Sequence, residues 1–169
     1  MIHVRNAERT DTKLLTQLIL EMGQHERLPV FVTEERLAAD GFGLSPRFRA
    51  LIAEADGKAA GYALFFECYS SFQGVGIFLE DLFVRDDFRG KGVGAALLSS
   101  IAAKVVHLGY FGIVFNVLDW NQSALQFFKR SGASELSERK TLCLEGIALR
   151  ELANAGLVDA SSTSESRQG

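Results

Sequence analysis

Three glycines alternate with other residues in the stretch 89–94, where a strand-like run gives way to a helix-like run. The preceding residues 78–84 are rich in β-formers, and the apolar residues that follow recur at helical spacing. A glycine-rich turn at such a place offers unpaired backbone N–H groups and the positive end of the helix dipole to an anion. Arg89 and Lys91 add positive charge. The pattern predicts a phosphate-binding loop.

Three established glycine signatures compete for this loop. A P-loop needs Gly-x-x-x-x-Gly-Lys-Ser/Thr, which does not occur in the chain. A dinucleotide fingerprint needs Gly-x-Gly-x-x-Gly after the first strand of a βαβ unit, whereas this run reads Gly-x-Gly-x-Gly and lies mid-chain. The remaining pattern, Arg-x-x-Gly-x-Gly, resembles the acyl-CoA pyrophosphate loop of the GNAT family of N-acetyltransferases. An ordinary glycine-rich turn is the alternative.

The elements that would position this loop follow from periodicity and cap residues. Asp56-Gly57 between two apolar runs predicts a hairpin turn. Strands are expected at 2–5, 48–54, 58–68, 112–118, 133–136 and 140–144, and a further strand is expected to end at 84. Helices are expected from Thr10 or Asp11, from Thr33 to about Gly41, from the glycine loop to Gly109, from Asn121 to Gly132, and at 148–155.

This order mixes hairpin-connected strands with a later βαβ unit, so we expect a mixed sheet with helices on both faces. The fold class is α/β (mixed α+β). The order agrees with the GNAT acyl-CoA N-acyltransferase fold, which implies a mixed, mostly antiparallel sheet of about seven strands flanked by helices.

The bulk composition sets limits on domain count and partners. At 169 residues with 47% hydrophobic residues, we expect one domain over residues 1–157, with a disordered polar tail over 158–169. The net charge of −3 and a sequence pI of about 5.6 disfavour nucleic acid and anionic membranes as partners. The mild acidity suits a cationic partner.

Neither the cysteines nor the chain start indicates export. Cys68 and Cys143 occur singly in apolar runs, which predicts buried reduced thiols rather than a disulfide or a metal site. The first residues lead straight into a strand, and no apolar run approaches membrane-spanning length. We therefore expect a cytoplasmic protein.

Several stretches in family order resemble spermidine/spermine (diamine) and thialysine N-acetyltransferases, a branch of the GNAT family that acetylates small polycations. The similarity covers roughly residues 2 to 150. The stretches are Asp-Gly-Phe-Gly at 40–43, Tyr-Ala-Leu-Phe-Phe at 62–66, Leu-Glu-Asp-Leu-Phe-Val at 79–84, the glycine loop, Trp-Asn at 120–121 and Phe-Phe-Lys-Arg-Ser-Gly-Ala at 127–133.

The resemblance implies acetyl-CoA as co-substrate, with no metal. A backbone N–H of the 81–84 stretch, assigned to Leu82, would meet the thioester carbonyl and stabilise the developing oxyanion. Asn121 can equally be explained as a helix N-cap. The residues assigned to the cofactor are Leu82, Phe83, Val84, Arg89, Gly90, Lys91, Gly92, Val93, Gly94, Asn121, Ser123 and Phe128.

The resemblance also assigns Glu26, Glu80 and Asp81 to the amine. Carboxylates hold the second, charged ammonium of a diamine and attract cations. Adjacent strand residues normally point to opposite faces, so a shared site for Glu80 and Asp81 requires a bulge. Asp81 could instead be solvated or paired with Arg85. Glu80, next to Leu79 in an apolar strand, fits that alternative less well.

An alkylammonium with a pKa of ~10.4 must lose a proton before it attacks. We expect Glu80 to accept this proton through water. The amine would then attack acetyl-CoA directly, as the resemblance implies, without a covalent enzyme intermediate.

One residue departs from the family pattern. Phe128 stands where these enzymes usually carry a tyrosine that protonates the leaving thiolate, and phenylalanine has no proton to give. Because a thiol of pKa ~8.5 is a tolerable leaving group, we expect slower turnover rather than none.

Two alternative functions remain open at this point. One is acetylation of a protein N-terminus or lysine side chain, which needs an open peptide groove. The other is a catalytically weakened acyl-CoA-binding module, which Phe128 favours and the three carboxylates disfavour. The resemblance further implies a homodimer with late-chain strands at the interface.

Overall fold

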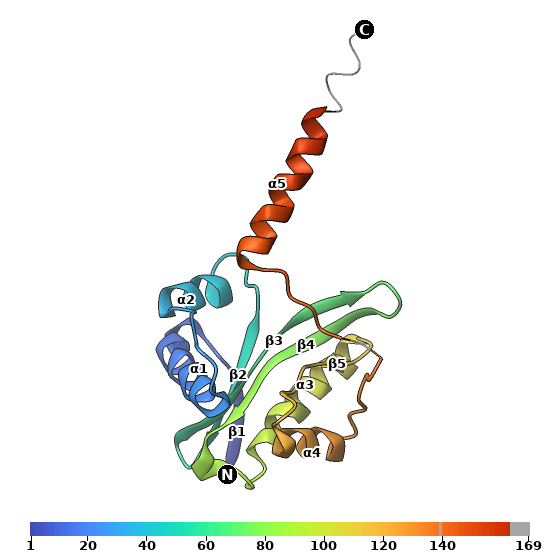
Figure 1. The fold of residues 1–169 in the computed structure, drawn as a ribbon. Coiled ribbons are helices and arrows are strands. Elements are labelled where there is room, and N and C mark those ends of the chain that lie inside the picture. The colour runs from blue at the N-terminus through green and yellow to red at the C-terminus, as the bar shows by residue number, and fades with distance from the viewer. Residues whose placement is uncertain (139, 163–169) are drawn as a thin grey trace. The chain divides into compact units, whose positions relative to one another are not determined.

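The computed structural model describes residues 1–138 and 140–162 (Figure 1). The chain divides into two compact units, residues 1–119 and 120–169. The first unit contains the whole sheet and three of the α-helices, and the second contains two α-helices. The loop and the three carboxylates singled out above all lie in the first unit, which is therefore considered first.

Five strands in the described residues form one mixed sheet in the order β1-β2-β3-β4-β5. Neighbours among the first four strands are antiparallel, and β5 is parallel to β4. Asp56 and Gly57 both have positive φ, 53° and 73°, as the predicted hairpin turn requires. The strands are β1 (Ile2–Asn6), β2 (Arg49–Ala55), β3 (Lys58–Ser70), β4 (Gly74–Val84) and β5 (Ile113–Val114).

The expectation of about seven strands was wrong. The described residues of 133–136 and 140–144 form no strand, and all but Ala133 are exposed. The expected strand at 112–118 shrinks to the two residues of β5. A strand is stable when a partner completes its ladder, and local apolar content does not supply a partner.

Helices cover both faces of the sheet, as expected (Figure 1). Helices α1 (Thr12–Glu26) and α2 (Glu34–Phe42) lie on one face, and α3 (Val93–Leu108) lies on the other. Thr33 caps α2 by accepting the Arg36 N–H, and α3 ends at Gly109 in the left-handed region. These ends are close to the predicted ones.

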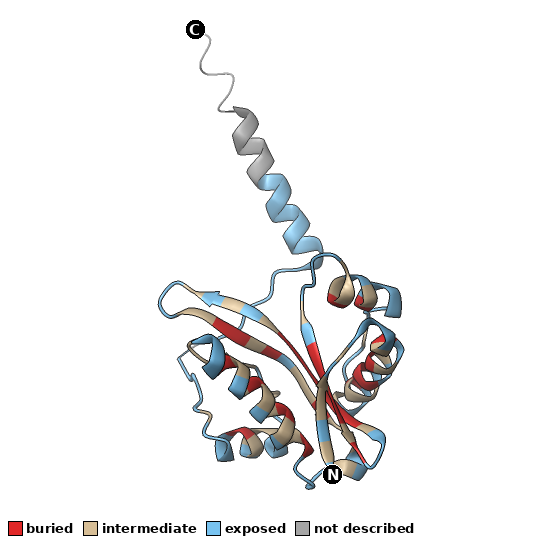
Figure 2. Cartoon of the chain, turned by 180° about the vertical axis from the view of Figure 1, so that it is seen from behind, coloured by how far each residue is buried: buried red, intermediate tan, exposed pale blue. Residues whose placement is uncertain are grey.

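Buried residues on both faces of the sheet hold the first unit together (Figure 2). On the α3 side, the helix buries one stripe at three- and four-residue spacing: Val93, Leu97, Ile101 and Val105. On the α1 side, the core cluster contains Leu15, Leu18, Ile19, Leu37, Ala50, Tyr62, Leu64 and Phe83. Tyr62 is the one residue in this cluster with a hydroxyl group, so the sheet carries a polar atom into an apolar layer.

The second unit contains α4 (Gln122–Arg130) and α5 (Gly146–Ser162). The Asn121 side chain caps α4, and Gly132 follows it with φ 95°, both as predicted. Helix α5 is longer than the expected 148–155 and includes residues 158–162, which were assigned to the tail. The remainder of that tail, 163–169, lies outside the described residues. Whether the chain acts as one domain stays a prediction.

Two further expectations concern single residues and the membrane. Cys68 is half-buried and Cys143 is exposed, so the expectation of burial was wrong for Cys143. Among the described residues, no helix combines the length and apolar character needed to cross a membrane.

Candidate active site

The glycine loop has the backbone conformation that its sequence predicts. Gly90 and Gly92 have φ of 71° and 88°, in the region that disfavours side chains, while Gly94 lies inside α3. The first N–H bonded back to this turn is that of Ala96, which donates to the Gly92 carbonyl. The N–H groups before it have no carbonyl one turn earlier to bond. This end of α3 therefore fits the pyrophosphate of an acyl-CoA.

The two cations of the loop are partly engaged. Arg89 donates from Nε to the Val84 carbonyl at 3.0 Å and pairs with Asp86 at 2.9 Å. Lys91 Nζ lies 5.7 Å from the centre of the Phe88 ring. The backbone N–H groups of the loop are therefore the main candidate anion-binding groups, because the charge of Arg89 is already paired with Asp86.

β4 contains the bulge that a shared carboxylate site requires. Leu79 pairs with Phe65 and Asp81 pairs with Leu64, so Glu80 is the additional residue. Beyond the bulge Asp81 shares a face with Phe83, opposite Leu64 and Tyr62 of β3. Without the extra residue, Asp81 would point with Leu79 to the α3 side. The bulge turns Asp81 toward α1.

The same part of β4 has an open edge in the first unit, because β5 pairs with β4 only at Ile77 and Phe78. The Arg85 N–H donates to the Ala60 carbonyl of β3. Ladder bonds alternate along an antiparallel strand, so the N–H groups of Leu82 and Val84 point away from β3, toward the open edge. This geometry fits the predicted role of the Leu82 N–H as a donor to a thioester oxygen.

Asp81 is the most perturbed carboxyl group of the site. Its Oδ2 accepts a hydrogen bond from the Tyr62 hydroxyl at 2.9 Å. Burial raises the pKa of Asp81 to about 6; Tyr62 acts in the opposite direction, and the negative charges of Glu80 and Glu26 add to the rise. Burial raises the pKa of Tyr62 as well, so its hydroxyl stays protonated and remains a donor.

The structure therefore places the three predicted amine-binding carboxylates close enough for their charges to act on one another. Glu26 is the last residue of α1, which Arg27 terminates in the left-handed conformation with φ 58°. Burial raises the pKa of Glu26, and His25 acts in the opposite direction. Because Glu26 and Glu80 both act on the charge of Asp81, the three groups share one electrostatic environment.

The expectation that Glu80 is enclosed was wrong, and the alternative of a solvated or Arg85-paired Asp81 does not hold. Glu80 is exposed at the bulge rather than enclosed by the apolar strand, and Asp81 is largely removed from water. Arg85 is not the partner of Asp81. It donates to Glu21 with Nε and Nη2 at 2.6 and 2.7 Å, and its Nη1 donates to the Ala59 carbonyl at 2.8 Å.

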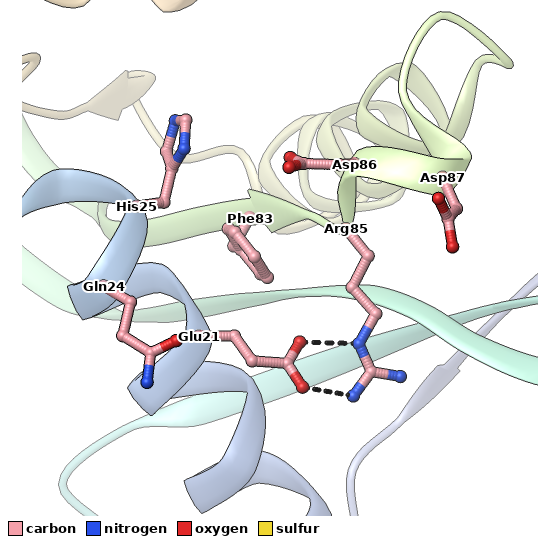
Figure 3. Close-up of a pocket in the computed structure, with 7 residues that line it drawn as sticks. All are labelled: Glu21, Gln24, His25, Phe83, Arg85, Asp86 and Asp87. Atoms are coloured by element: carbon pink, nitrogen blue, oxygen red, sulfur yellow. Dashed lines mark hydrogen bonds and ion pairs between the residues drawn. The ribbon is translucent and has the colours of Figure 1, made fainter.

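This ion pair forms one wall of an open hollow of about 460 Å³ between the end of α1 and the end of β4 (Figure 3). Phe83 links the hollow to the carboxylates, because its ring contacts both Tyr62 and His25, with centroids 6.3 and 6.5 Å apart. The lining residues are Glu21, Gln24, His25, Phe83, Arg85, Asp86 and Asp87. Three of these residues are acidic, Glu21, Asp86 and Asp87, and Glu21 is paired with Arg85.

Asn121, Ser123 and Phe128 belong to the second unit, so their contribution to the cofactor site stays a prediction. Asn121 Oδ1 accepts the Ala124 N–H at 3.1 Å and the Ser123 hydroxyl at 3.2 Å, which confirms its role as an N-cap. Phe128 is buried, and its ring packs against Phe127 with centroids 5.1 Å apart.

Sequence reasoning missed two contributors, Tyr62 and the Glu21–Arg85 pair. Tyr62 was noticed only as part of a stretch that resembles the family. Its hydroxyl within the apolar run 59–66 was the available indication, since a buried tyrosine usually finds a hydrogen-bond partner. Nothing in the sequence indicates that Arg85 pairs with Glu21, because 64 residues separate them.

Comparison with known proteins settles the family. The model of the acetyltransferase (GNAT) family matches residues 12–133. The chain belongs to the GNAT family. This GNAT protein is 35% identical over 165 residues to thialysine N-epsilon-acetyltransferase of Bos taurus, covering 90% of this chain and 97% of the relative. It is 31% identical over 146 residues to spermidine/spermine N(1)-acetyltransferase-like protein 1 of Homo sapiens, covering 81% and 21%.

Solved structures show the same fold. An integron cassette protein from the mobile metagenome of V. cholerae superimposes with a TM-score of 0.75 at 22% identity, covering 90% of this chain and 97% of that chain. Aminoglycoside N-acetyltransferase AAC(6')-Iy in complex with CoA gives a TM-score of 0.68 at 20% identity, covering 87% and 95%. The protein is thus a GNAT acetyltransferase, an enzyme of a family that uses acetyl-CoA.

Proposed function

We propose that this enzyme transfers the acetyl group of acetyl-CoA directly to a primary amine of a small polycation or a lysine-like amino acid. The observation that carries the proposal is the grouping of Glu26 at the end of α1 with Glu80 and Asp81 at the β4 bulge. A substrate with two amines presents one to the acetyl donor while the other stays charged. Clustered carboxylates suit the charged one.

The names of the relatives agree with such a substrate. Besides the thialysine enzymes, L-ornithine N5-acetyltransferase of Arabidopsis thaliana is 38% identical over 98 residues, covering 57% of this chain and 43% of the relative. Thialysine and ornithine are both amino acids with an amine on the side chain. This shared chemistry favours a small diamine over a peptide as the acceptor.

The exposure of each carboxylate suggests its role in the reaction. Glu80 is exposed at the bulge, where water can carry a proton from the acceptor amine to its carboxylate. Asp81 and Glu26 are more enclosed and hold the second ammonium. The backbone N–H of Leu82, on the open edge of β4, stabilises negative charge on the acetyl carbonyl oxygen.

The acetyl donor would lie along the open edge and reach the glycine loop. Leu82, Phe83 and Val84 contact its acyl end and pantetheine arm, and the residues of 89–94 bind the pyrophosphate through backbone N–H groups. Asn121, Ser123 and Phe128 would complete the cofactor site from the second unit. We further propose a homodimer, with late-chain segments at its interface.

The test is release of CoA from acetyl-CoA in the presence of diamines, lysine analogues, monoamines and short peptides. Glu80→Gln should lower turnover of a diamine by two or more orders of magnitude and leave CoA affinity unchanged, since general-base catalysis contributes about 10²–10⁴-fold. Glu34→Gln in α2, an exposed carboxylate outside the site, is the matched control.

Acetylation of a diamine together with a wild-type rate for Glu34→Gln would support the assignment. Unchanged turnover in Glu80→Gln would remove Glu80 as the proton acceptor. Tight CoA binding with no acceptor turned over would instead support a weakened acyl-CoA-binding module. The presence of Phe128 in place of the usual tyrosine would then explain the weak catalysis.

A further inference from the structure

Tyr62 places a hydroxyl group beneath the carboxylate cluster. The residue is completely buried between β3 and α1, in the cluster that includes Leu15, Leu18 and Ile19. Its hydroxyl donates to Asp81 Oδ2 at 2.9 Å and lies 3.4 Å from Met22 Sδ. The thioether is a weak acceptor, so the Asp81 carboxylate is the main partner of this hydroxyl.

We infer that Tyr62 is a positioning and specificity-determining residue, which fixes the Asp81 carboxylate toward the second ammonium of the substrate and keeps it charged. The inference rests on the proposed function, because it assigns the second ammonium of the substrate to Asp81. Tyr62 contacts neither the acetyl donor nor the reacting amine in this scheme; it acts through Asp81.

The bulge explains why Asp81 needs such a partner. It turns the side chain into a layer of apolar residues, where a carboxylate without a hydrogen-bond donor is costly. The Tyr62 hydroxyl engages one carboxylate oxygen and thereby leaves the other for an ammonium. Since Tyr62 is locked in the core, it also fixes the direction in which Asp81 points.

The charged groups around Asp81 make this hydrogen bond important. Glu80 on the same strand and Glu26 on α1 both oppose its ionisation, and His25 acts on Glu26. The Tyr62 hydroxyl favours the ionised form. Without it, Asp81 would be protonated over a wider pH range and would lose its attraction for a cation.

The experiment compares wild type with Tyr62→Phe, which keeps the ring and removes the hydroxyl. We expect KM for a diamine to rise at least tenfold near pH 7, with a smaller change in kcat and little change for a monoamine. The acid limb of kcat/KM for the diamine should move to higher pH by about one unit, because the hydrogen bond that favours the charged form is lost.

Tyr110→Phe is the matched control. Tyr110 also donates to a carboxylate, Glu67, at 2.8 Å, but this hydrogen bond is exposed and Glu67 pairs with Ile77, outside the bulge. Its kinetics and pH profile should follow wild type. A general effect of losing a tyrosine hydroxyl would appear in both variants, whereas the proposed effect appears only in Tyr62→Phe.

A second readout does not depend on activity. Titration of aspartate carboxyl groups by carbon-13 NMR, with the Asp81 signal identified by its loss in Asp81→Asn, measures the pKa of Asp81 directly. It should rise in Tyr62→Phe and stay unchanged in Tyr110→Phe. If no amine is acetylated, the proposed function fails, and this titration still decides whether Tyr62 controls Asp81.

Incorporation of 3-fluorotyrosine in a Tyr69→Phe, Tyr110→Phe background provides a test that retains the tyrosine. A more acidic phenol is a stronger donor, so the Asp81 titration and the acid limb should both move to lower pH. An Asp81 pKa that moves in neither Tyr62→Phe nor the fluorinated protein would overturn the inference. So would equal KM increases for diamine and monoamine.

Discussion

At the scale of single residues, the raised pKa of Asp81 lowers the stability of the folded state when this carboxyl group is ionised. Its pKa rises from 3.8 to about 6 because it is buried and flanked by acidic groups. A carboxyl group whose pKa is higher in the folded state binds its proton more tightly there. Between pH 4 and 6 the folded state therefore holds more protons than the unfolded state, and stability falls as the pH rises.

The first prediction follows from this sign. Asp81→Asn keeps an oxygen to accept the Tyr62 hydroxyl and removes the charge. The variant should gain stability relative to wild type as the pH rises: the difference between the two free energies of unfolding should grow by about 2–3 kcal/mol from pH 4 to pH 8. Diamine acetylation should be lost. Urea unfolding at several pH values measures the difference.

Asp87→Asn serves as the control, because Asp87 is exposed in the hollow beside β4. Its stability should track wild type across the same range. A pH-independent difference between wild type and Asp81→Asn would show that Asp81 ionises as freely in the folded chain as in the unfolded one.

The same residues show how far single-residue reasoning extends. The identities of Glu26, Glu80 and Asp81 could be predicted, because a resemblance carries residue types at fixed positions. The exposure of Glu80 was not predicted, and the burial of Asp81 was left open. Neighbouring residues in a regular strand alternate between faces, and the sequence does not reveal which residue a bulge leaves out of the ladder.

At the scale of elements, the Glu21–Arg85 pair ties α1 to β4. Both partners are about one quarter to one third exposed, and the Arg85 guanidinium makes three hydrogen bonds. The pair joins the helix that ends at Glu26 to the strand that carries Glu80 and Asp81. Its function is thus to hold the carboxylate-bearing elements at a fixed separation.

Substituting either partner should loosen this connection. Glu21→Gln and Arg85→Gln should each raise KM for the diamine several-fold and leave KM for acetyl-CoA near wild type. A double-mutant cycle on stability should give a coupling of about 1 kcal/mol, as expected for a partly exposed pair.

Arg36→Gln removes an ion pair within α2, between Arg36 and Asp40, and is the matched control. It should leave both KM values unchanged. Additive effects of the Glu21 and Arg85 substitutions, with no coupling energy, would contradict the assigned function of the pair.

The ends of helices with a recognisable cap residue were predicted closely and strands less well, for a physical reason. Caps such as Thr33, Asn121 and Gly109 satisfy backbone groups within one turn, so a few neighbouring residues determine them. Strands depend on a partner elsewhere in the chain. The residues of 133–136 and 140–144 have strand-like composition, and their described members lack such a partner.

At the scale of the whole molecule, the late chain contains several large apolar side chains that are exposed. Leu142, Leu144, Ile147, Leu149 and Leu152 are 91, 51, 66, 48 and 60% exposed. Apolar side chains grouped in one segment are typical of a surface that associates. The proposed homodimer would bury them.

This proposal predicts that charges on α5 abolish association. The double substitution Leu149→Glu, Leu152→Glu places two carboxylates on one side of the helix, and analytical ultracentrifugation should show a monomer in place of a dimer. Val106→Glu, at a 79% exposed site on α3, controls for added surface charge and should remain dimeric. A doubly substituted protein that still sediments as a dimer would place the interface elsewhere.

The short pairing between β4 and β5 has a consequence for how binding can be observed. Within the first unit, no strand protects the amides of Leu82 and Val84, since β5 meets β4 only at Ile77 and Phe78. Amide hydrogens that a ladder does not hold exchange with deuterated solvent without global unfolding. A ligand that lies along this edge slows deuterium uptake at these two positions, next to Asp81, whereas a ligand bound elsewhere leaves their uptake unchanged.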